Sequence, residues 1–254
     1  MKFDLSNIER SNSDIKRGVM LPKKLTKELS EFIGIMVGDG HLGRNVGRSK
    51  SGCKFTRSNI LISGNKLEEL YLKNVMDLFH RLFNLNMSYV QDTSPNAVII
   101  RAQSKGILEF LNKICEIPLN RKTNSVKIPD IIKVASKSIK YAFLRGLADT
   151  DFSVTFKNRT NKGHNYPVIK ASFKSENLVK DLENLYLELG FKYCVIYNER
   201  GYDKRFNRYD YINSIYLNGK LNFSKWFNRI GFSNSKFQRK VVKWKKDGIC
   251  PPGY

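Results

Sequence analysis

Two acidic residues, Asp39 and Asp151, each follow an apolar run that contains a glycine five positions before the acid. The runs cover residues 32–40 and 144–152, so one pattern occurs twice along the chain. Two carboxylates held close together repel each other unless a positive charge lies between them. Carboxylate, carbonyl and water oxygens are the ligands that Mg²⁺ prefers. The two acids therefore indicate a shared metal site if the fold brings the two runs together.

The small residues in the runs indicate how they could meet. Gly34 and Gly38 are four residues apart and share one face of a helix, and the second run has Gly146 and Thr150 at the same spacing. Small residues at this spacing let two helix backbones approach closely. We expect two helices that pack against each other and place the two acids side by side, the first helix stopping at Gly40.

The two runs resemble the paired motifs of LAGLIDADG homing endonucleases, in the monomeric two-motif form that archaeal or organellar introns encode. The matching positions are Gly34, Asp39 and Gly40 in the first copy and Gly146, Asp149 and Asp151 in the second. The chain departs from the motif at two places. Phe152 stands where the motif has its last glycine, and Val37 replaces its first acid.

The resemblance implies a site-specific endonuclease that hydrolyses phosphodiester bonds of double-stranded DNA at a long asymmetric target. It implies Mg²⁺ as the cofactor, with Mn²⁺ or Ca²⁺ able to occupy the same site. The implied metal ligands are the last acid of each motif and the carbonyl before it, namely Asp39 with Gly38 and Asp151 with Thr150.

A basic residue is also expected near the two acids, to polarise water and phosphate. Lys174 is the first candidate, because it ends a predicted strand directly before a helix cap and resembles the strand-end lysine of several archaeal members of the family. Lys220 is the second, at the end of the fourth predicted strand of the second half. We expect both acids and one of these lysines to be catalytic.

The net charge points to the same partner. The 254 residues include 45 Lys and Arg against 23 Asp and Glu, a formal charge of +22. Such an excess suits a polyanion and is not expected of an enzyme acting on small molecules. The four cysteines lack the spacing of a zinc site. No apolar run is long enough to cross a membrane, and the polar first residues do not resemble a signal peptide, so we expect a cytoplasmic or organellar protein.

Hydrophobic periodicity predicts an α+β fold with the order αββαββα occurring twice and with antiparallel sheets. The motif helices are expected at the central interface, and the two sheets are expected to form a saddle for DNA, in a protein that works as a monomer. The predicted parts are an N-terminal arm (1–22), a first repeat (23–115), a linker (116–137), a second repeat (138–231) and a basic C-terminal tail (232–254).

Basic residues are concentrated in the predicted hairpins, and strand ribbons can enter the major groove of DNA. The residues predicted to contact DNA are Arg44, Arg48, Lys50, Lys54, Arg57, Arg101, Lys157, Arg159, Lys170, Arg200, Lys204, Arg205 and Arg208.

Two other functions use the same fold. One is an RNA maturase, which would bind its intron RNA as a splicing cofactor, and one protein can have both activities. The other is a DNA-binding relative without catalytic activity. The acids retained in both motifs argue against the inactive relative, whereas the sequence does not separate the endonuclease from the maturase.

Overall fold

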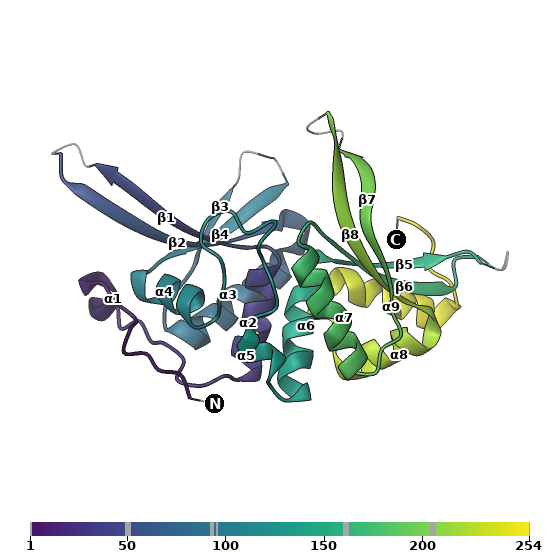
Figure 1. Ribbon diagram of the computed structural model, residues 1–254. Coiled ribbons are helices and arrows are strands. Elements are labelled where there is room, and N and C mark those ends of the chain that lie inside the picture. The colour runs from purple at the N-terminus through teal and green to yellow at the C-terminus, as the bar shows by residue number, and fades with distance from the viewer. Residues whose placement is uncertain are drawn as a thin grey trace. The chain divides into compact units, whose positions relative to one another are not determined.

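The computed structural model describes residues 2–48, 52–91, 94, 96–159, 163–203 and 207–253. Within these residues the chain divides into two compact units, and each unit has a four-stranded antiparallel sheet with helices on one face (Figure 1). The first unit comprises Met1–Lys122 with Pro129–Leu147, and the second Thr123–Ile128 with Ala148–Tyr254. The predicted α+β class is confirmed.

The first unit has the predicted order of helices and strands, and its sheet has the strand order β1-β2-β4-β3. Its elements are α1 (Asn12–Lys16), α2 (Lys27–Val37), β1 (Gly40–Arg48), β2 (Lys54–Asn65), the 3-10 helix η1 (Lys66–Glu68), α3 (Glu69–Phe83), β3 (Ser88–Gln91), β4 (Ala97–Gln103), α4 (Lys105–Lys113), α5 (Asp130–Lys133) and most of α6 (Lys137–Asp151).

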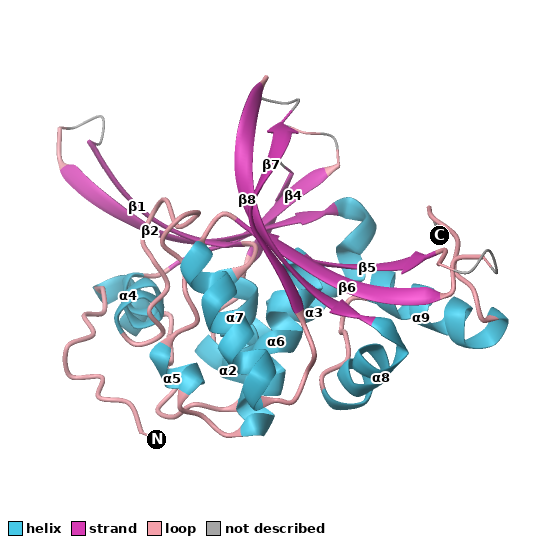
Figure 2. Ribbon diagram, turned by 45° about the vertical axis from the view of Figure 1, so that its right-hand side comes forward, coloured by secondary structure: helices cyan, strands magenta, loops and turns pink. Residues whose placement is uncertain are grey.

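The second unit repeats this order, with the strand order β5-β6-β8-β7 (Figure 2). After the end of α6 its elements are β5 (Phe152–Lys157), β6 (Tyr166–Phe173), α7 (Glu176–Glu188), β7 (Cys194–Asp203), β8 (Arg208–Asn218), α8 (Gly219–Arg229) and α9 (Ser235–Asp247). Both αββαββα repeats are therefore present.

Each sheet has one face against helices and one open face. In the first sheet Ile60 and Ile62 of β2 are buried under the helices, at 0% and 1% exposure. Side chains alternate along the strand, so Leu61 and the exposed Arg57 of β2 point to the opposite side. We call that side the open face. In the second sheet Ile169 of β6 marks the helix side in the same way.

The helices α2 and α6 pack with their backbones in contact within the first unit. A Cβ atom added to Gly34 would lie 2.2 Å from the carbonyl oxygen of Phe143, and one added to Gly146 would lie 2.0 Å from the carbonyl oxygen of Glu31. No side chain fits at either position. The prediction that these glycines allow two motif helices to approach closely is confirmed.

Polar contacts fix the register of this helix pair. The hydroxyl of Ser30 donates to the carbonyl of Ile139 at 2.8 Å. The guanidinium of Arg145 binds both carboxylate oxygens of Glu31, at 3.0 and 2.6 Å. Such a bidentate pair has a defined geometry as well as a favourable energy.

The end of α2 differs from the prediction of a glycine stop at Gly40. The helix ends at Val37, and its C-cap Gly38 has φ of −74°, outside the left-handed region. Gly40 instead begins β1, where an added Cβ would lie 2.5 Å from Cα of Met36. Glycine is required here because the chain passes close to the helix it has just left.

The segment predicted as an N-terminal arm (1–22) is part of the first unit. Asp14 is fully buried and accepts a hydrogen bond from the amide of Gly106 at 3.0 Å, at the start of α4. Ser11 caps α1 by accepting from the amide of Asp14. The carboxylate of Asp14 therefore joins the start of the chain to α4.

The basic segment predicted as a tail contains α9, which packs into the second unit. Phe237 and Val241 are buried, at 3% and 1% exposure. The Trp244 ring lies 5.6 Å from that of Phe156 and 5.3 Å from that of Phe223. The apolar side of this helix belongs to the core, and its lysines lie on the rest of its surface.

Replacing either interface glycine should destabilise the protein. Gly34→Ala or Gly146→Ala forces a methyl group into a carbonyl oxygen, and such overpacking costs roughly 1–3 kcal/mol or more. The free energy of unfolding from urea titration measures it. Gly201→Ala is the matched control, because an added Cβ there has nothing within 4 Å. Equal stabilities of the three variants would contradict the close contact.

Candidate functional site

The first motif acid, Asp39, lies in the turn between α2 and β1 and is half-buried. Its carbonyl oxygen accepts a hydrogen bond from the amide of Ser63 on β2 at 3.2 Å. This bond ties the turn to the sheet, so the position of the acid is fixed by both α2 and β2.

A lysine that sequence analysis did not single out binds the end of α2. The ammonium of Lys122 donates to the carbonyl oxygens of Met36 at 2.7 Å and Val37 at 2.8 Å, and to that of Gly38. The last carbonyls of a helix lack helical partners and carry the negative end of its dipole. The residues directly before Asp39 therefore form a site for positive charge.

Nothing local in the sequence pointed to Lys122, because 84 residues separate it from Gly38. It lies in the segment predicted as a linker. The pKa of His41 on β1 is lowered, mainly by burial and in addition by the positive charge of Lys122.

The second motif acid, Asp151, is the last residue of α6 and is half-buried. The hydroxyl of Thr150 donates to its carboxylate at 3.4 Å. The helix thus continues through the acid in this copy, whereas α2 ends two residues before Asp39. That Asp39 and Asp151 lie side by side stays a prediction.

Phe152, the departure from the motif glycine, is a core residue. It begins β5 opposite Ala171, is 4% exposed, and its ring lies 5.6 Å from that of Trp226. At the matching place in the first sheet, Gly40 lies opposite Ile62. In the first sheet the small residue is on the first strand and the large one on the second, and in the second sheet this order is reversed. The space between sheet and helices is therefore filled in both units.

Asp149, which matches the first acid of the motif, has a structural role. It is 1% exposed and accepts hydrogen bonds from the amides of Ser233 at 2.9 Å and Asn234 at 3.1 Å. The side chain of Asn234 in turn caps α9 and donates to the carbonyl of Asp149 at 3.3 Å. The buried carboxylate therefore fixes the start of α9. In the first copy Val37 is buried instead.

The two lysines predicted as catalytic lie as follows. Lys174 follows β6 and forms an ion pair with Asp210 of β8, and its hydrogen bond lowers the pKa of that carboxyl. Its carbonyl accepts from the side chain of Asn213 at 3.1 Å. Lys220 was predicted to end a strand, but β8 ends at Asn218 and Lys220 is exposed in the first turn of α8.

The open face of the first sheet has a polar hollow of about 410 Å³ near Arg57, Arg101 and the amide pair of Asn59 and Gln103. The Gln103 amide donates to the Asn59 side-chain oxygen at 3.1 Å. Gly47 of β1 has no side chain, and the ring of Phe55 on β2 lies over it. Arginine and amide side chains are the groups that read base edges in the major groove.

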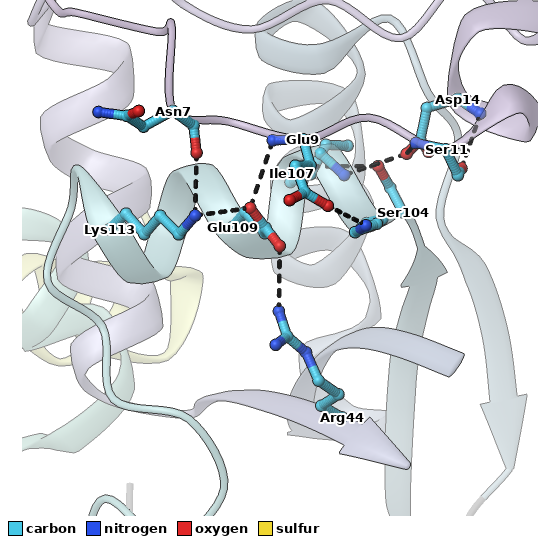
Figure 3. A network of polar contacts seen from close by, with 11 residues as sticks. Asn7, Glu9, Ser11, Asp14, Arg44, Ser104, Ile107, Glu109 and Lys113 are labelled. Carbon is cyan, nitrogen blue, oxygen red and sulfur yellow. Dashed lines mark hydrogen bonds and ion pairs between the residues drawn. The ribbon is translucent and has the colours of Figure 1, made fainter. Parts of the chain in front are cut away.

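Arg44 points to the other side. Its guanidinium reaches Glu109 of α4 at 3.3 Å, as Figure 3 shows. Glu109 is 5% exposed and also accepts from Lys113 at 2.9 Å and from the amide of Glu9 at 3.3 Å. This predicted DNA-contact residue therefore satisfies a buried carboxylate and ties β1 to α4 and to the N-terminal residues.

Two further predicted contacts share the side of Arg44. Arg48 lies opposite Lys54 in the β1–β2 register, and both are in phase with Arg44. Because side chains alternate along a strand, these residues lie on the face opposite to Arg57. The predicted basic surface of this ribbon is thus divided between two faces.

The second sheet divides its basic residues in the same way. Lys157 and Lys170 lie on the open face, where both ammonium groups approach the Tyr216 ring, at 6.0 and 5.2 Å from its centroid. Arg208 lies on this face, 3.8 Å from Asp210.

Two further predicted contacts in the second unit, Arg159 after β5 and Arg200 in β7, stack on tyrosines. Arg159 lies over the Tyr166 ring, with its guanidinium carbon 4.1 Å from the centroid. Arg200 lies over Tyr209 at 3.8 Å, on the face opposite to Arg208.

Three predicted contacts, Lys50, Lys204 and Arg205, lie outside the described residues. Among the residues described, no group of three or more His, Cys, Asp and Glu side chains is placed to hold a metal ion. None of the helices described is long and apolar enough to cross a membrane.

Comparison with known proteins identifies the motif. Residues 138–231 match the family model of a LAGLIDADG-like domain. The matched segment is therefore a LAGLIDADG-like domain. The second repeat is the matched part, and the first repeat has the same order of elements.

Two solved homing endonucleases share the fold of this protein. I-DmoI in complex with DNA and Mn is 15% identical, with a TM-score of 0.54 over 82% of this chain and 98% of that chain. I-SmaMI bound to uncleaveable DNA is 13% identical, with a TM-score of 0.56 over 89% of this chain and 91% of that chain.

The curated relatives match this chain over only a segment of their own length. A probable translation initiation factor IF-2 of Methanocaldococcus jannaschii is 23% identical over 91% of this chain and 17% of its own length. The tRNA-splicing ligase RtcB of Methanopyrus kandleri is 25% identical over 80% of this chain and 20% of its own length. The chain thus spans a fifth or less of these relatives.

Asp149→Asn should lower the free energy of unfolding by about 1.5–3 kcal/mol, because it weakens charge-assisted hydrogen bonds to buried amides. The change in the free energy of unfolding can be measured by thermal unfolding and checked by chemical denaturation. Glu69→Gln is the control, since Glu69 is 60% exposed and pairs only with the exposed Lys73 in the contacts described. Its effect should stay below about 1 kcal/mol. Equal effects would contradict a structural role for Asp149.

Proposed function

We propose that this protein is a LAGLIDADG endonuclease that hydrolyses phosphodiester bonds in double-stranded DNA. The observation that supports it most is the end of α2, where three carbonyls converge on a positive charge directly before Asp39. The structures of I-DmoI and I-SmaMI, which share the fold, contain DNA. We propose a long asymmetric target, because the two sheets carry different side chains, and a monomer as the active form.

The proposed metal ligands are Asp39 with the Gly38 carbonyl and Asp151 with the Thr150 carbonyl. Hard oxygen donors of this kind fit Mg²⁺, which keeps several waters as further ligands. The I-DmoI structure with Mn and an I-SmaMI structure with DNA and calcium ions support a divalent cation. When bound, such an ion would polarise a phosphoryl oxygen of the DNA and lower the pKa of a water molecule that it coordinates.

We propose Lys122 as the basic residue of this site. Its ammonium already lies on the Gly38 carbonyl, where it can stabilise negative charge that develops on a phosphate. Lys174 is less suited, because the Asp210 carboxylate offsets its charge, whereas the carbonyls that hold Lys122 carry no formal charge. Lys220 is less suited because it is exposed at the start of α8.

The proposed duplex interface is the open face of each sheet. In the first sheet it includes Arg57 and Arg101, and in the second Lys157, Lys170 and Arg208. Arg44, Arg48, Lys54 and Arg200 lie on the opposite faces, so we do not include them in this interface.

The experiment is cleavage of a plasmid library of randomised targets with Mg²⁺, followed by sequencing of the cut ends. Asp39→Asn and Asp151→Asn should each abolish cutting, because an amide keeps the shape of the carboxylate but loses its charge. Their affinity for duplex DNA should stay close to that of the unchanged protein. Glu69→Gln serves as a control that keeps both properties.

The outcomes separate the alternatives. Cutting by either Asp→Asn variant at the unchanged rate would refute the assignment of that acid. If the unchanged protein binds duplex DNA but cuts no member of the library with Mg²⁺, the catalytically inactive relative is the correct description. Lys122→Met should slow cutting without weakening binding.

Binding should depend on salt through the open-face arginines. Each phosphate contact contributes about −0.9 to the slope of log affinity against log salt. Arg57→Met and Arg101→Met should each reduce this slope, measured by fluorescence anisotropy with a duplex. Arg48→Met, at the far side of the same ribbon, is the matched control and should leave the slope unchanged. Equal slopes for all three variants would contradict the open-face interface.

A further inference from the structure

The outer part of the β7–β8 ribbon has two chemically different faces. The register places Arg200 opposite Tyr211 and Tyr202 opposite Tyr209. Residues directly opposite each other in antiparallel strands share a face, and the next pair along points the other way. These four residues therefore form one surface, which we call the tyrosine face.

The tyrosine face is exposed. Tyr202, Tyr209 and Tyr211 are 51%, 58% and 56% exposed. The rings of Tyr202 and Tyr209 lie 5.3 Å apart, and the Arg200 guanidinium lies 3.8 Å from the Tyr209 centroid. Three aromatic rings and an arginine thus form a compact exposed patch.

The reason for the exposure is the length of the ribbon. Nearer the helices, Tyr197 of β7 donates its hydroxyl to Glu183 of α7, and this contact marks the helix side of the sheet. A bulge follows between Ile196 and Glu199. Beyond it the ribbon extends past α7 and α8, as Figures 1 and 2 show, so none of the helices described in this unit covers the tyrosine face.

The chemistry of the patch favours unpaired bases. Aromatic side chains stack on the flat surface of a base, and arginine adds both a planar surface and a positive charge. Within a duplex the flat surfaces of the bases are covered by their neighbours, so stacking requires single strands or ends. The net charge of +22 draws any nucleic acid to the protein.

The opposite face of the same ribbon differs. There Gly201 lies opposite Asp210, and Asp210 pairs with Lys174. That face continues the open face of the sheet with Lys170, which suits the phosphates of a duplex. A ligand on the tyrosine face would therefore be separate from a duplex on the open face.

We propose that the tyrosine face binds single-stranded nucleic acid, with unpaired bases stacked on Tyr202, Tyr209 and Tyr211 and with Arg200 beside them. This site goes beyond the proposed duplex cleavage and does not depend on it. Both single-stranded DNA and RNA present the required bases, and the test includes one of each.

The test is fluorescence anisotropy with labelled oligo(dT) and oligo(U) of about 15 nucleotides, a length within the range that single-strand binding folds occupy. Tyr209→Ala and Tyr211→Ala should each weaken binding by about tenfold, the loss expected for one stacked base. Tyr209→Phe should keep the affinity, because the ring remains. Tyr89→Ala is the matched control, since Tyr89 is 44% exposed on the other sheet.

A duplex of the same length separates this site from the open face. Its affinity should be unchanged in Tyr209→Ala. Photocrosslinking with 5-iodouracil in either oligomer should label peptides from β7 and β8, as identified by mass spectrometry. A preference for oligo(U) would indicate RNA as the natural ligand, and a preference for oligo(dT) single-stranded DNA.

Several outcomes would overturn the proposal. One is an unchanged protein that does not bind either oligomer, and another is equal affinity of the alanine variants and the unchanged protein. Equal losses of single-strand and duplex binding in Tyr209→Ala would assign the face to the duplex interface instead. A change of sedimentation in Tyr209→Ala without nucleic acid would show that the face contacts another copy of the protein.

Discussion

The contact between the backbones of α2 and α6 is the constraint on which the motif depends. Gly34 and Gly146 each occupy a place where even a methyl group would collide with a carbonyl oxygen. The contact lies within the first unit, and α6 then continues into the second unit up to Asp151. A change at these glycines therefore alters the helix that presents the second acid as well as the packing of the first unit.

The roles of the two acids in the second motif copy differ because their surroundings differ. Asp149 is buried and binds backbone amides at the start of α9, whereas Asp151 is half-buried at the helix end. A buried carboxylate with amide partners stabilises the fold, and a half-exposed one remains accessible to a ligand. Val37, which replaces Asp149 in the first copy, is consistent with this division, because α9 follows only the second repeat.

Carboxylates also decide which basic residues are available for a polyanion. Glu109 engages Arg44, and Asp210 engages Lys174. Arg44 was predicted to contact DNA and Lys174 to be catalytic, yet the guanidinium of the first and the ammonium of the second form ion pairs within the protein. The large excess of basic residues leaves other cations on the open faces, among them Arg57 and Lys170. The charge count predicts the kind of partner, and the pairing of charges decides which basic side chains remain available to it.

Sequence alone determined the features that depend on local patterns. The repeated motif and the αββαββα order follow from spacing of a few residues, and the structure confirms the order. The α+β class follows from the same periodicities. The proposed acids are also the ones that the motif indicates.

Only the tertiary structure decided which side chains meet across long separations in sequence. Lys122 reaches the end of α2 because the chain returns there, and Phe152 fits because Ala171 lies opposite it. The tyrosine face is exposed because β7 and β8 extend past the helices. Local patterns fix the direction of a side chain relative to its own strand or helix, whereas its partner depends on how distant parts of the chain pack together.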